Sequence, residues 1–183
     1  MKQMSANKPL KDPSDANGLK FRVQNSEVLK AQMAALGGSP QPMAFSEVYG
    51  ALQTGVVDGQ ENTWSNIYGK KFFEVQDGTT ETNHGIIDYL LVTSTDWWDG
   101  LDGEIRDQLS TIIAEVTEAR NSESTAVNEA AKQEIIAAGG VVRQLSAAQR
   151  ENWVATMKPV WEQFRSDVGQ DNIEAAQAIN AKH

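Results

Sequence analysis

Three side chains within the first 62 residues could contribute to a binding site for a small organic anion. Arg22 lies in residues 19–24, where apolar and polar residues alternate, so it falls on the polar face of an expected strand. A guanidinium presents a rigid fork of donors that matches a carboxylate through two parallel hydrogen bonds. An ordinary solvent-exposed arginine, the commoner case, fits the same position, and the residues alone leave both interpretations open.

The other two side chains are Phe45 and Asn62. Phe45 follows Pro42 and Met43 where an extended piece gives way to a helix, so it fits core packing or an aromatic wall against a ligand's carbon skeleton. Asn62 ends a polar stretch, residues 58–62, between an expected strand and an expected helix, where α/β proteins favour ligand sites. Its amide N–H can face a carboxylate, or its side chain can cap the helix.

Catalytic arrangements are weakly represented in the sequence. The absence of cysteine excludes disulfides, zinc–thiolate sites and cysteine nucleophiles. The two histidines are His84 and His183, and there is no nucleophile elbow, P-loop or dinucleotide glycine fingerprint. We therefore expect no enzyme activity, no cofactor and no metal, and an enzyme of unknown class is the remote alternative.

The net charge of the chain limits the classes of molecule that it can bind. The formal net charge is −9 and the pI is about 4.7, so the surface repels phosphate backbones and we expect no nucleic-acid partner. An anionic ligand would need a local positive group. No run of 18 apolar residues exists, and residues 1–7 lack the apolar core of a signal peptide. We expect either a cytoplasmic protein or one whose leader lay upstream.

Elements that would position these side chains alternate along the first half of the chain. The patterns predict strands at residues 19–23, 56–57 and 86–93, the last apolar and buried. They also predict helices over residues 27–36, 46–52 and 62–73, with Ser46 and Asn62 as N-caps and a turn at Asp58–Gly59.

The second half is mostly helical. Helical spacing without glycine or proline runs over residues 105–138 and predicts one helix roughly 50 Å long at about 1.5 Å per residue. Gly139 and Gly140 should end it, and a short strand at residues 141–142 should follow. Ser146 should begin a further helix that Pro159 kinks or restarts, and residues 172–179 a last one. The order indicates an α/β fold with a parallel or mixed sheet.

Four stretches follow one another at a spacing that resembles the DctP-type solute-binding proteins of tripartite ATP-independent periplasmic (TRAP) transporters. They are GLKFRV at 18–23, PMAFSEVY at 42–49, ALQTGVVDGQEN at 51–62 and KFFEVQ at 71–76. The long helix and the late KPV at 158–160 extend the resemblance over essentially the whole chain. Any one stretch would be weak, and the combination is highly specific.

The resemblance implies a fold, a function and a set of site residues. The fold is type II periplasmic-binding-protein-like, with two α/β domains joined by strands and a long helix. The domains close on a small carboxylate, such as a dicarboxylate or another organic acid. Arg22 would form the salt bridge to the ligand, Asn62 would be the second carboxylate partner, Phe45 the aromatic cleft residue, and Lys2 a further basic residue of the cleft. Many relatives have proline after the asparagine where this chain has Thr63, which leaves the ligand's identity open.

The resemblance also implies that the chain is truncated. Residues 1–87 and 128–183 would form the second domain, and residues 88–127, with the long helix spanning both domains, would pack with a first domain that lies outside the chain. We therefore expect a periplasmic parent and TRAP membrane permease subunits as its partners. Because residues 88–127 would leave apolar surface bare, we expect a homo-oligomer. A structural or oligomerising fragment that binds no solute is the alternative.

Overall fold

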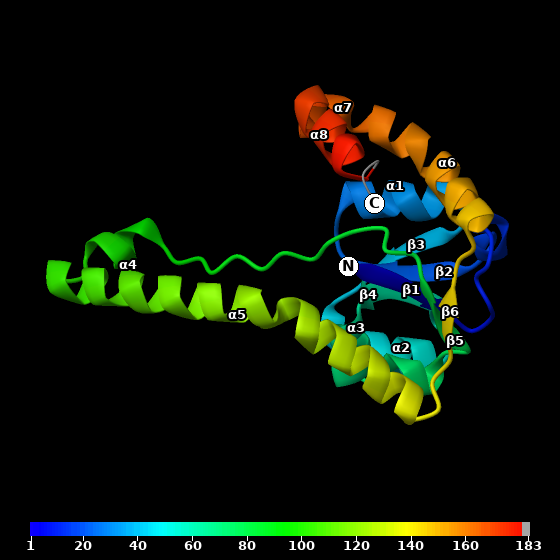
Figure 1. Ribbon diagram of the computed structural model, residues 1–183, viewed down its shortest axis with the longest axis horizontal. Coiled ribbons are helices and arrows are strands. Elements are labelled where there is room, and N and C mark those ends of the chain that lie inside the picture. The colour runs from blue at the N-terminus through cyan, green and yellow to red at the C-terminus, as the bar shows by residue number, and fades with distance from the viewer. Residues whose placement is uncertain (181–183) are drawn as a thin grey trace.

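A single mixed β-sheet organises the computed structural model, which describes residues 1–180 (Figure 1). Within these residues the strand order is β3-β2-β4-β1-β5-β6, and β1 alone runs opposite to the other five. The strands are β1 (Lys2–Ala6), β2 (Lys20–Val23), β3 (Ser39–Pro42), β4 (Gly59–Thr63), β5 (Gly78–Glu81) and β6 (Val142–Gln144). The mixed sheet agrees with the α/β class expected from the sequence.

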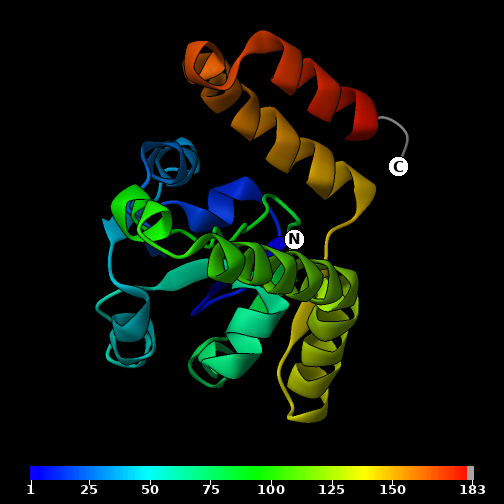
Figure 2. The same ribbon diagram turned by 90° about the vertical axis from the view of Figure 1, so that its left-hand side faces the viewer.

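Helices cover both faces of the sheet (Figures 1 and 2). One face carries α1 (Glu27–Ala35) and α6 (Ala147–Gln163), with α7 (Arg165–Val168) and α8 (Gln170–Asn180) beyond α6. The other face carries α2 (Val48–Gln53), α3 (Trp64–Gly69) and the C-terminal part of α5 (Gly103–Ala137). Short 3-10 turns η1 (Pro13–Ala16), η2 (Phe45–Glu47) and η3 (Phe72–Val75) and the short helix α4 (Thr95–Asp99) complete the described elements.

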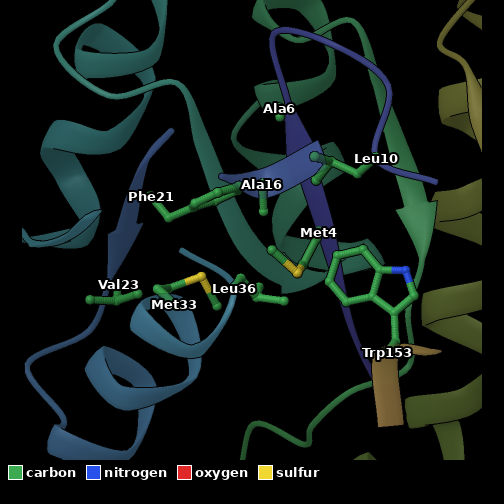
Figure 3. Packing of buried hydrophobic residues seen from close by; sticks show 9 residues of the cluster. All are labelled: Met4, Ala6, Leu10, Ala16, Phe21, Val23, Met33, Leu36 and Trp153. Carbon is green, nitrogen blue, oxygen red and sulfur yellow. The ribbon is translucent and has the colours of Figure 1, made fainter. Parts of the chain in front are cut away.

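Two hydrophobic clusters hold the helices onto the sheet. The first lies between the sheet, α1 and α6, and Figure 3 shows Trp153 of α6 beside Met4 of β1. The indole N–H of Trp153 donates to the Lys11 carbonyl at 3.1 Å, so the buried ring leaves no polar atom unsatisfied. The second cluster lies under α2, α3 and α5 and consists of Val48, Ala51, Leu52, Val57, Trp64, Ile67, Phe72, Ala131 and Ile135.

Strand alternation assigns the side chains of β2 to the two faces. Phe21 and Val23 point into the first cluster, so Arg22 between them points to the α2–α3 face. Gly59, at the start of β4, lets this strand lie close to its neighbours. A Cβ there would come within 2.5 Å of the Ser5 carbonyl and 2.6 Å of the Phe21 ring.

The segment at residues 88–127, which we call the arm, leaves the body of the protein. It contains α4 and the N-terminal part of α5, and Figure 1 shows it extending away from the sheet. The buried strand expected at residues 86–93 is wrong, because these residues join no sheet. Their apolar side chains are largely exposed, and Leu90 is 84% exposed. The β-branched and apolar composition therefore reflects a surface that the described chain leaves uncovered.

The predicted helices agree better with the structure than the predicted strands. α5 is one helix of 35 residues, and Gly139 follows its C-terminus with a φ of 88°. Ser146 caps α6 in a capping box with Gln149, and the helix continues through Pro159 to Gln163 without restarting. No described helix combines the length and apolarity needed to cross a bilayer. His183 lies outside the described residues.

Several expected boundaries in the first half are wrong. Ser46 lies inside the turn η2 and does not cap α2, which begins at Val48. Residues 56–57 form no strand, and the strand β4 begins instead at Gly59, where a turn was expected. The strands β1 and β5 were not expected from the sequence, because both are polar.

Candidate functional site

Arg22 is buried on the face of β2 that points toward α2 and α3. It stands in register with Gln60 of the neighbouring parallel strand β4, and only 3% of the residue is exposed. Its Nε and Nη2 atoms donate to the carbonyl of Met43 at 3.0 and 2.7 Å, which orients the guanidinium. Burial lowers the pKa of Arg22, and the charge of Glu61 partly opposes that shift. Within residues 1–180 Arg22 forms no ion pair.

A shallow hollow opens beside the guanidinium. Its volume is about 410 Å³, and its lining residues are Arg22, Gln24, Asn25, Pro42, Met43 and Ala44. Nη1 of Arg22 makes no hydrogen bond to a described residue, and it is not among the unpartnered atoms sealed from solvent. The fork therefore has one edge held by the protein and one edge open to a ligand.

Phe45 lies beside Arg22. The Cζ atom of Arg22 is 5.7 Å from the centroid of the Phe45 ring, and the ring of Phe72 meets Phe45 edge-on at 5.7 Å. The Nζ atom of Lys70 also lies 5.7 Å from this centroid, so two cations flank one aromatic side chain. Phe45 thus has a packing contact and a partly exposed surface, and both uses expected from the sequence remain open to it.

Asn62 lies on β4 and not at a helix cap. The N-cap of α3 is Thr63, whose side chain makes no capping bond, so the capping interpretation of Asn62 is wrong. Alternation along β4 places Asn62 on the same side as Gln60, and its Nδ2 donates to the Oε1 of Gln60 at 2.9 Å. Its Oδ1 accepts from the Nδ2 of Asn66 at 3.0 Å. Register and alternation place Arg22 and Asn62 on one face, although Asn62 and Phe45 do not line the 410 Å³ hollow.

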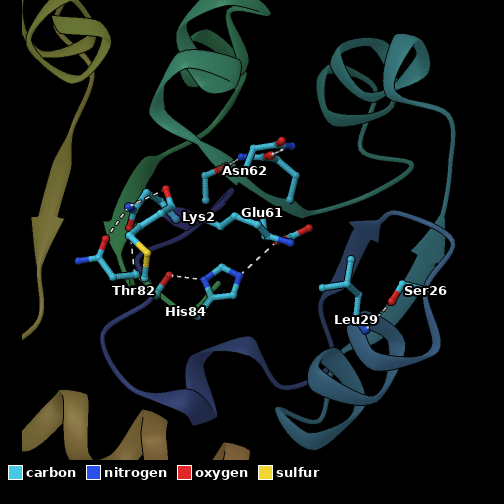
Figure 4. A network of polar contacts seen from close by, with 12 residues as sticks. Lys2, Ser26, Leu29, Glu61, Asn62, Thr82 and His84 are labelled. Atoms are coloured by element: carbon cyan, nitrogen blue, oxygen red, sulfur yellow. Dashed lines mark hydrogen bonds and ion pairs between the residues drawn. The ribbon is translucent and has the colours of Figure 1, made fainter. Parts of the chain in front are cut away.

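Lys2 occupies the opposite face of the same strands. Lys2 of β1 forms a buried ion pair with Glu61 of β4, and these side chains are 4% and 1% exposed. The Nε2 atom of His84 lies 3.2 Å from the same carboxylate, and its Nδ1 lies 2.7 Å from the hydroxyl of Thr82 (Figure 4). Register pairs Lys2 with Thr63 and Gln3 with Asn62, so Lys2 and Asn62 point to different sides of the sheet.

Sequence reasoning missed three members of this region, Gln60, Glu61 and His84. Gln60 and Glu61 were placed in the polar stretch between an expected strand and an expected helix, so their alternation across the strand β4 was not recognised. His84 was given no role from the sequence, because its partner Glu61 lies 23 residues away in the chain. No periodic signal marks Gln60 and Glu61 as strand residues, because residues 58–63 contain no apolar side chain.

Comparison with known proteins identifies the family. The profile of "bacterial extracellular solute-binding protein, family 7", called DctP, matches residues 1–167. The chain belongs to this family. The C4-dicarboxylate-binding periplasmic protein DctP of Vibrio cholerae is 64% identical over 182 residues, which cover 100% of this chain and 55% of that protein.

Solved structures of TRAP periplasmic solute-binding proteins share the fold. A TRAP periplasmic solute-binding protein from Shewanella oneidensis with bound succinate has a TM-score of 0.95 and 48% identity, covering 98% of this chain and 59% of that one. One from Pseudomonas aeruginosa with bound L-malate has a TM-score of 0.86 and 44% identity, covering 89% of this chain and 57% of that one. The chain therefore spans a little over half the length of these relatives, which are named as periplasmic solute-binding or dicarboxylate-binding proteins.

Proposed function

We propose that this chain supplies one wall of a binding site for a four-carbon dicarboxylate in a TRAP transporter of the periplasm. Arg22 would bind one ligand carboxylate through its open edge, Asn62 would donate a second hydrogen bond, and Phe45 would contact the carbon skeleton. Residues 1–87 and 128–183 would form one domain of the binding protein. The arm would pack with a further domain that completes the cleft, and the loaded protein would deliver its ligand to the membrane permease subunits.

The observation that carries this proposal is the unpaired burial of Arg22. Removing a guanidinium from water is costly unless an anion neutralises it, and the described residues provide none within ion-pair distance. The Met43 carbonyl satisfies part of the fork and leaves Nη1 unpartnered. A ligand carboxylate would supply the missing charge. The succinate and L-malate in related structures support a dicarboxylate as the ligand class.

Lys2 has a different place in the proposal. Its charge is matched by Glu61, so it is not available as a free cation in the way Arg22 is. We assign Lys2 to the support of β4 behind Asn62, with contact to the ligand only after the ion pair rearranges. The proposal concerns binding alone, as in the solute-binding proteins that this chain resembles.

Thermal unfolding with and without ligand tests the proposal. Succinate at tenfold its Kd should stabilise the folded chain by about 1.4 kcal/mol, because a ligand that binds only the folded state shifts the equilibrium by mass action. Butane-1,4-diol, which has the same carbon chain without charge, should have no effect. Succinate that stabilises wild type and Arg22→Met alike would show that the effect is general salt stabilisation and that Arg22 holds no ligand.

An oligomerising role is the second candidate, and the exposed arm favours it. Tyr89, Leu91 and Trp97 are 80%, 79% and 54% exposed, which is unusual for large apolar side chains on a monomer. We propose that copies of this chain associate through the arm when no further domain covers it.

A further inference from the structure

A directed chain of hydrogen bonds crosses β4 and β1 behind the proposed site. Each side chain donates to the next, over distances of 3.0, 2.9, 2.8 and 2.9 Å. We call this chain the amide relay, and from first donor to last acceptor its members are Asn66, Asn62, Gln60, Ser5 and Gln76. Two of the four links, Asn62 to Gln60 and Gln60 to Ser5, connect residues that strand alternation or register places on one face of the sheet.

The relay ends on groups that can only accept hydrogen bonds. Nε2 of Gln76 donates to the main-chain carbonyls of Asp58 and Val75 at 3.3 and 3.0 Å. Because a carbonyl cannot donate, Gln76 must turn its Nε2 toward them and its Oε1 toward Ser5. Ser5 must then donate to Gln76, and its remaining lone pair accepts from the Nε2 of Gln60.

The same logic sets the orientation of Asn62. Gln60 is left with its Oε1 toward Asn62, so the Nδ2 of Asn62 faces Gln60 and the Oδ1 faces Asn66. Asn66 uses its Nδ2 for this bond and for a second one to the hydroxyl of Tyr89 at 3.3 Å. The Nδ2 of Asn62 therefore keeps one hydrogen beyond the bond to Gln60, and its Oδ1 is already engaged.

We propose that Gln60, Ser5 and Gln76 are positioning residues that hold Asn62 as a hydrogen-bond donor and thereby make the site selective for carboxylates. An asparagine turned the other way would present Oδ1 and would repel an anion. This inference rests on the proposed function, because it assumes that Asn62 faces the ligand. It adds that Gln76, which belongs to the segment before β5 and lines no part of the hollow, decides the polarity of the site.

Two substitutions at Gln76 have opposite expected effects. Gln76→Lys replaces the acceptor with a group that only donates, so the Ser5 hydroxyl must turn to Gln60 and the amides of Gln60 and Asn62 must flip. Gln76→Glu keeps an acceptor toward Ser5, so the direction of the relay is retained, while the loss of the donor to the Asp58 and Val75 carbonyls should lower the stability of the folded chain. Succinate affinity should fall about three- to tenfold in Gln76→Lys and stay near wild type in Gln76→Glu, since one hydrogen bond is at stake. Simple Coulomb attraction predicts the reverse order for an anionic ligand.

The experiment measures succinate affinity and the side-chain amide NMR signals of Asn62 in wild type, both Gln76 variants and Ser5→Ala. Ser5→Ala adds no charge and interrupts the relay, so it provides a result even where a Gln76 variant fails to fold, and its affinity should lie between wild type and Gln76→Lys. Gln108→Glu, on the exposed surface of α5, controls for an added negative charge.

Each outcome decides the inference. Weakened binding and shifted Asn62 amide signals in Gln76→Lys, with both retained in Gln76→Glu, support it. Affinity that rises in Gln76→Lys and falls in Gln76→Glu, or Asn62 signals unchanged in every variant, overturns it. If wild type binds no succinate while Gln76→Lys still shifts the Asn62 signals, the relay stands and the proposed function fails.

Discussion

The guanidinium carbon of Arg22 lies 5.7 Å from the centroid of the Phe45 ring, and no described carboxylate pairs with this buried cation. The two residues come from β2 and η2, which are separated by α1 and β3 in the chain. A buried cation that needs an anion therefore lies next to an apolar surface that suits the carbon skeleton of a ligand. This combination is the structural reason, beyond membership of the family, for proposing that the chain binds a carboxylate.

Replacing Arg22 should separate binding from stability. Arg22→Lys should weaken succinate binding about tenfold or more, because an ammonium cannot reproduce the two-donor fork. Arg22→Met should abolish the binding and leave the free energy of unfolding unchanged or higher, because it removes a desolvated charge. Calorimetric titration and denaturant unfolding measure the two effects. A large loss of stability in Arg22→Met would mean that Arg22 serves the fold.

The pH dependence of that stability difference follows from the lowered pKa of Arg22. Folding disfavours the charged form of a group whose pKa is lowered by burial. Below the folded-state pKa both states carry the charge, so the stability difference between wild type and Arg22→Met should be constant with pH. It should change only as the pH rises through that pKa, where wild type gains stability. A stability difference between wild type and Arg22→Met that changes between pH 6 and pH 9 would contradict the view that burial of Arg22 causes this difference.

The buried pair of Lys2 and Glu61 should be sensitive to loss of one partner. Glu61→Gln leaves Lys2 charged and unpaired in the interior, which should cost about 3–5 kcal/mol of unfolding free energy. The exposed pair of Arg120 and Glu123 is the matched control, and Glu123→Gln should cost about 0–1 kcal/mol. Equal effects of the two substitutions in urea unfolding would show that the Lys2 pair is solvated.

The arm should drive self-association of the chain. Sedimentation at micromolar concentration should show a dimer or larger species rather than a 20.0 kDa monomer. Leu91→Glu should shift the distribution toward monomer, because it places a charge among the exposed apolar residues, whereas Gln163→Glu at the end of α6 should not. A folded wild-type monomer would show that the arm stays uncovered and that association is not its role.

Prediction from sequence succeeded where local signals decide structure. The helix α5 follows from unbroken helical spacing, and α6 follows from the Ser146 cap. The strands β1, β4 and β5 carry the polar sequences KQMSA, GQENT and GTTE, so apolar alternation could not reveal them. Hydrogen bonds and the Lys2 pair satisfy most of the buried polar side chains of these strands, although the hydroxyl of Thr79 in β5 has no partner among the described residues. The opposite error occurred at residues 86–93. Their apolar composition predicted a buried strand, but no part of the described chain covers their side chains.

The candidate site could likewise be predicted only in part from the sequence. The chemistry of Arg22 and its position on the polar face of a strand could be inferred from alternation. Its burial, its bond to Met43 and the lack of an ion pair could not, because each depends on segments distant in the sequence. Likewise the orientation of Asn62 depends on Gln76, which lies 14 positions along the chain and connects only through the sheet.

The NMR signal of the Arg22 Nε–H group during titration with succinate tests the central claim most directly. We expect a saturable shift with a Kd on the order of 1 mM, weak because one wall of a cleft leaves the ligand largely solvated. Phe45 ring signals should move with the same Kd, and butane-1,4-diol should move neither. An Arg22 signal that does not respond to succinate, or that responds equally to the diol, would contradict the assignment of this chain as a carboxylate-binding wall.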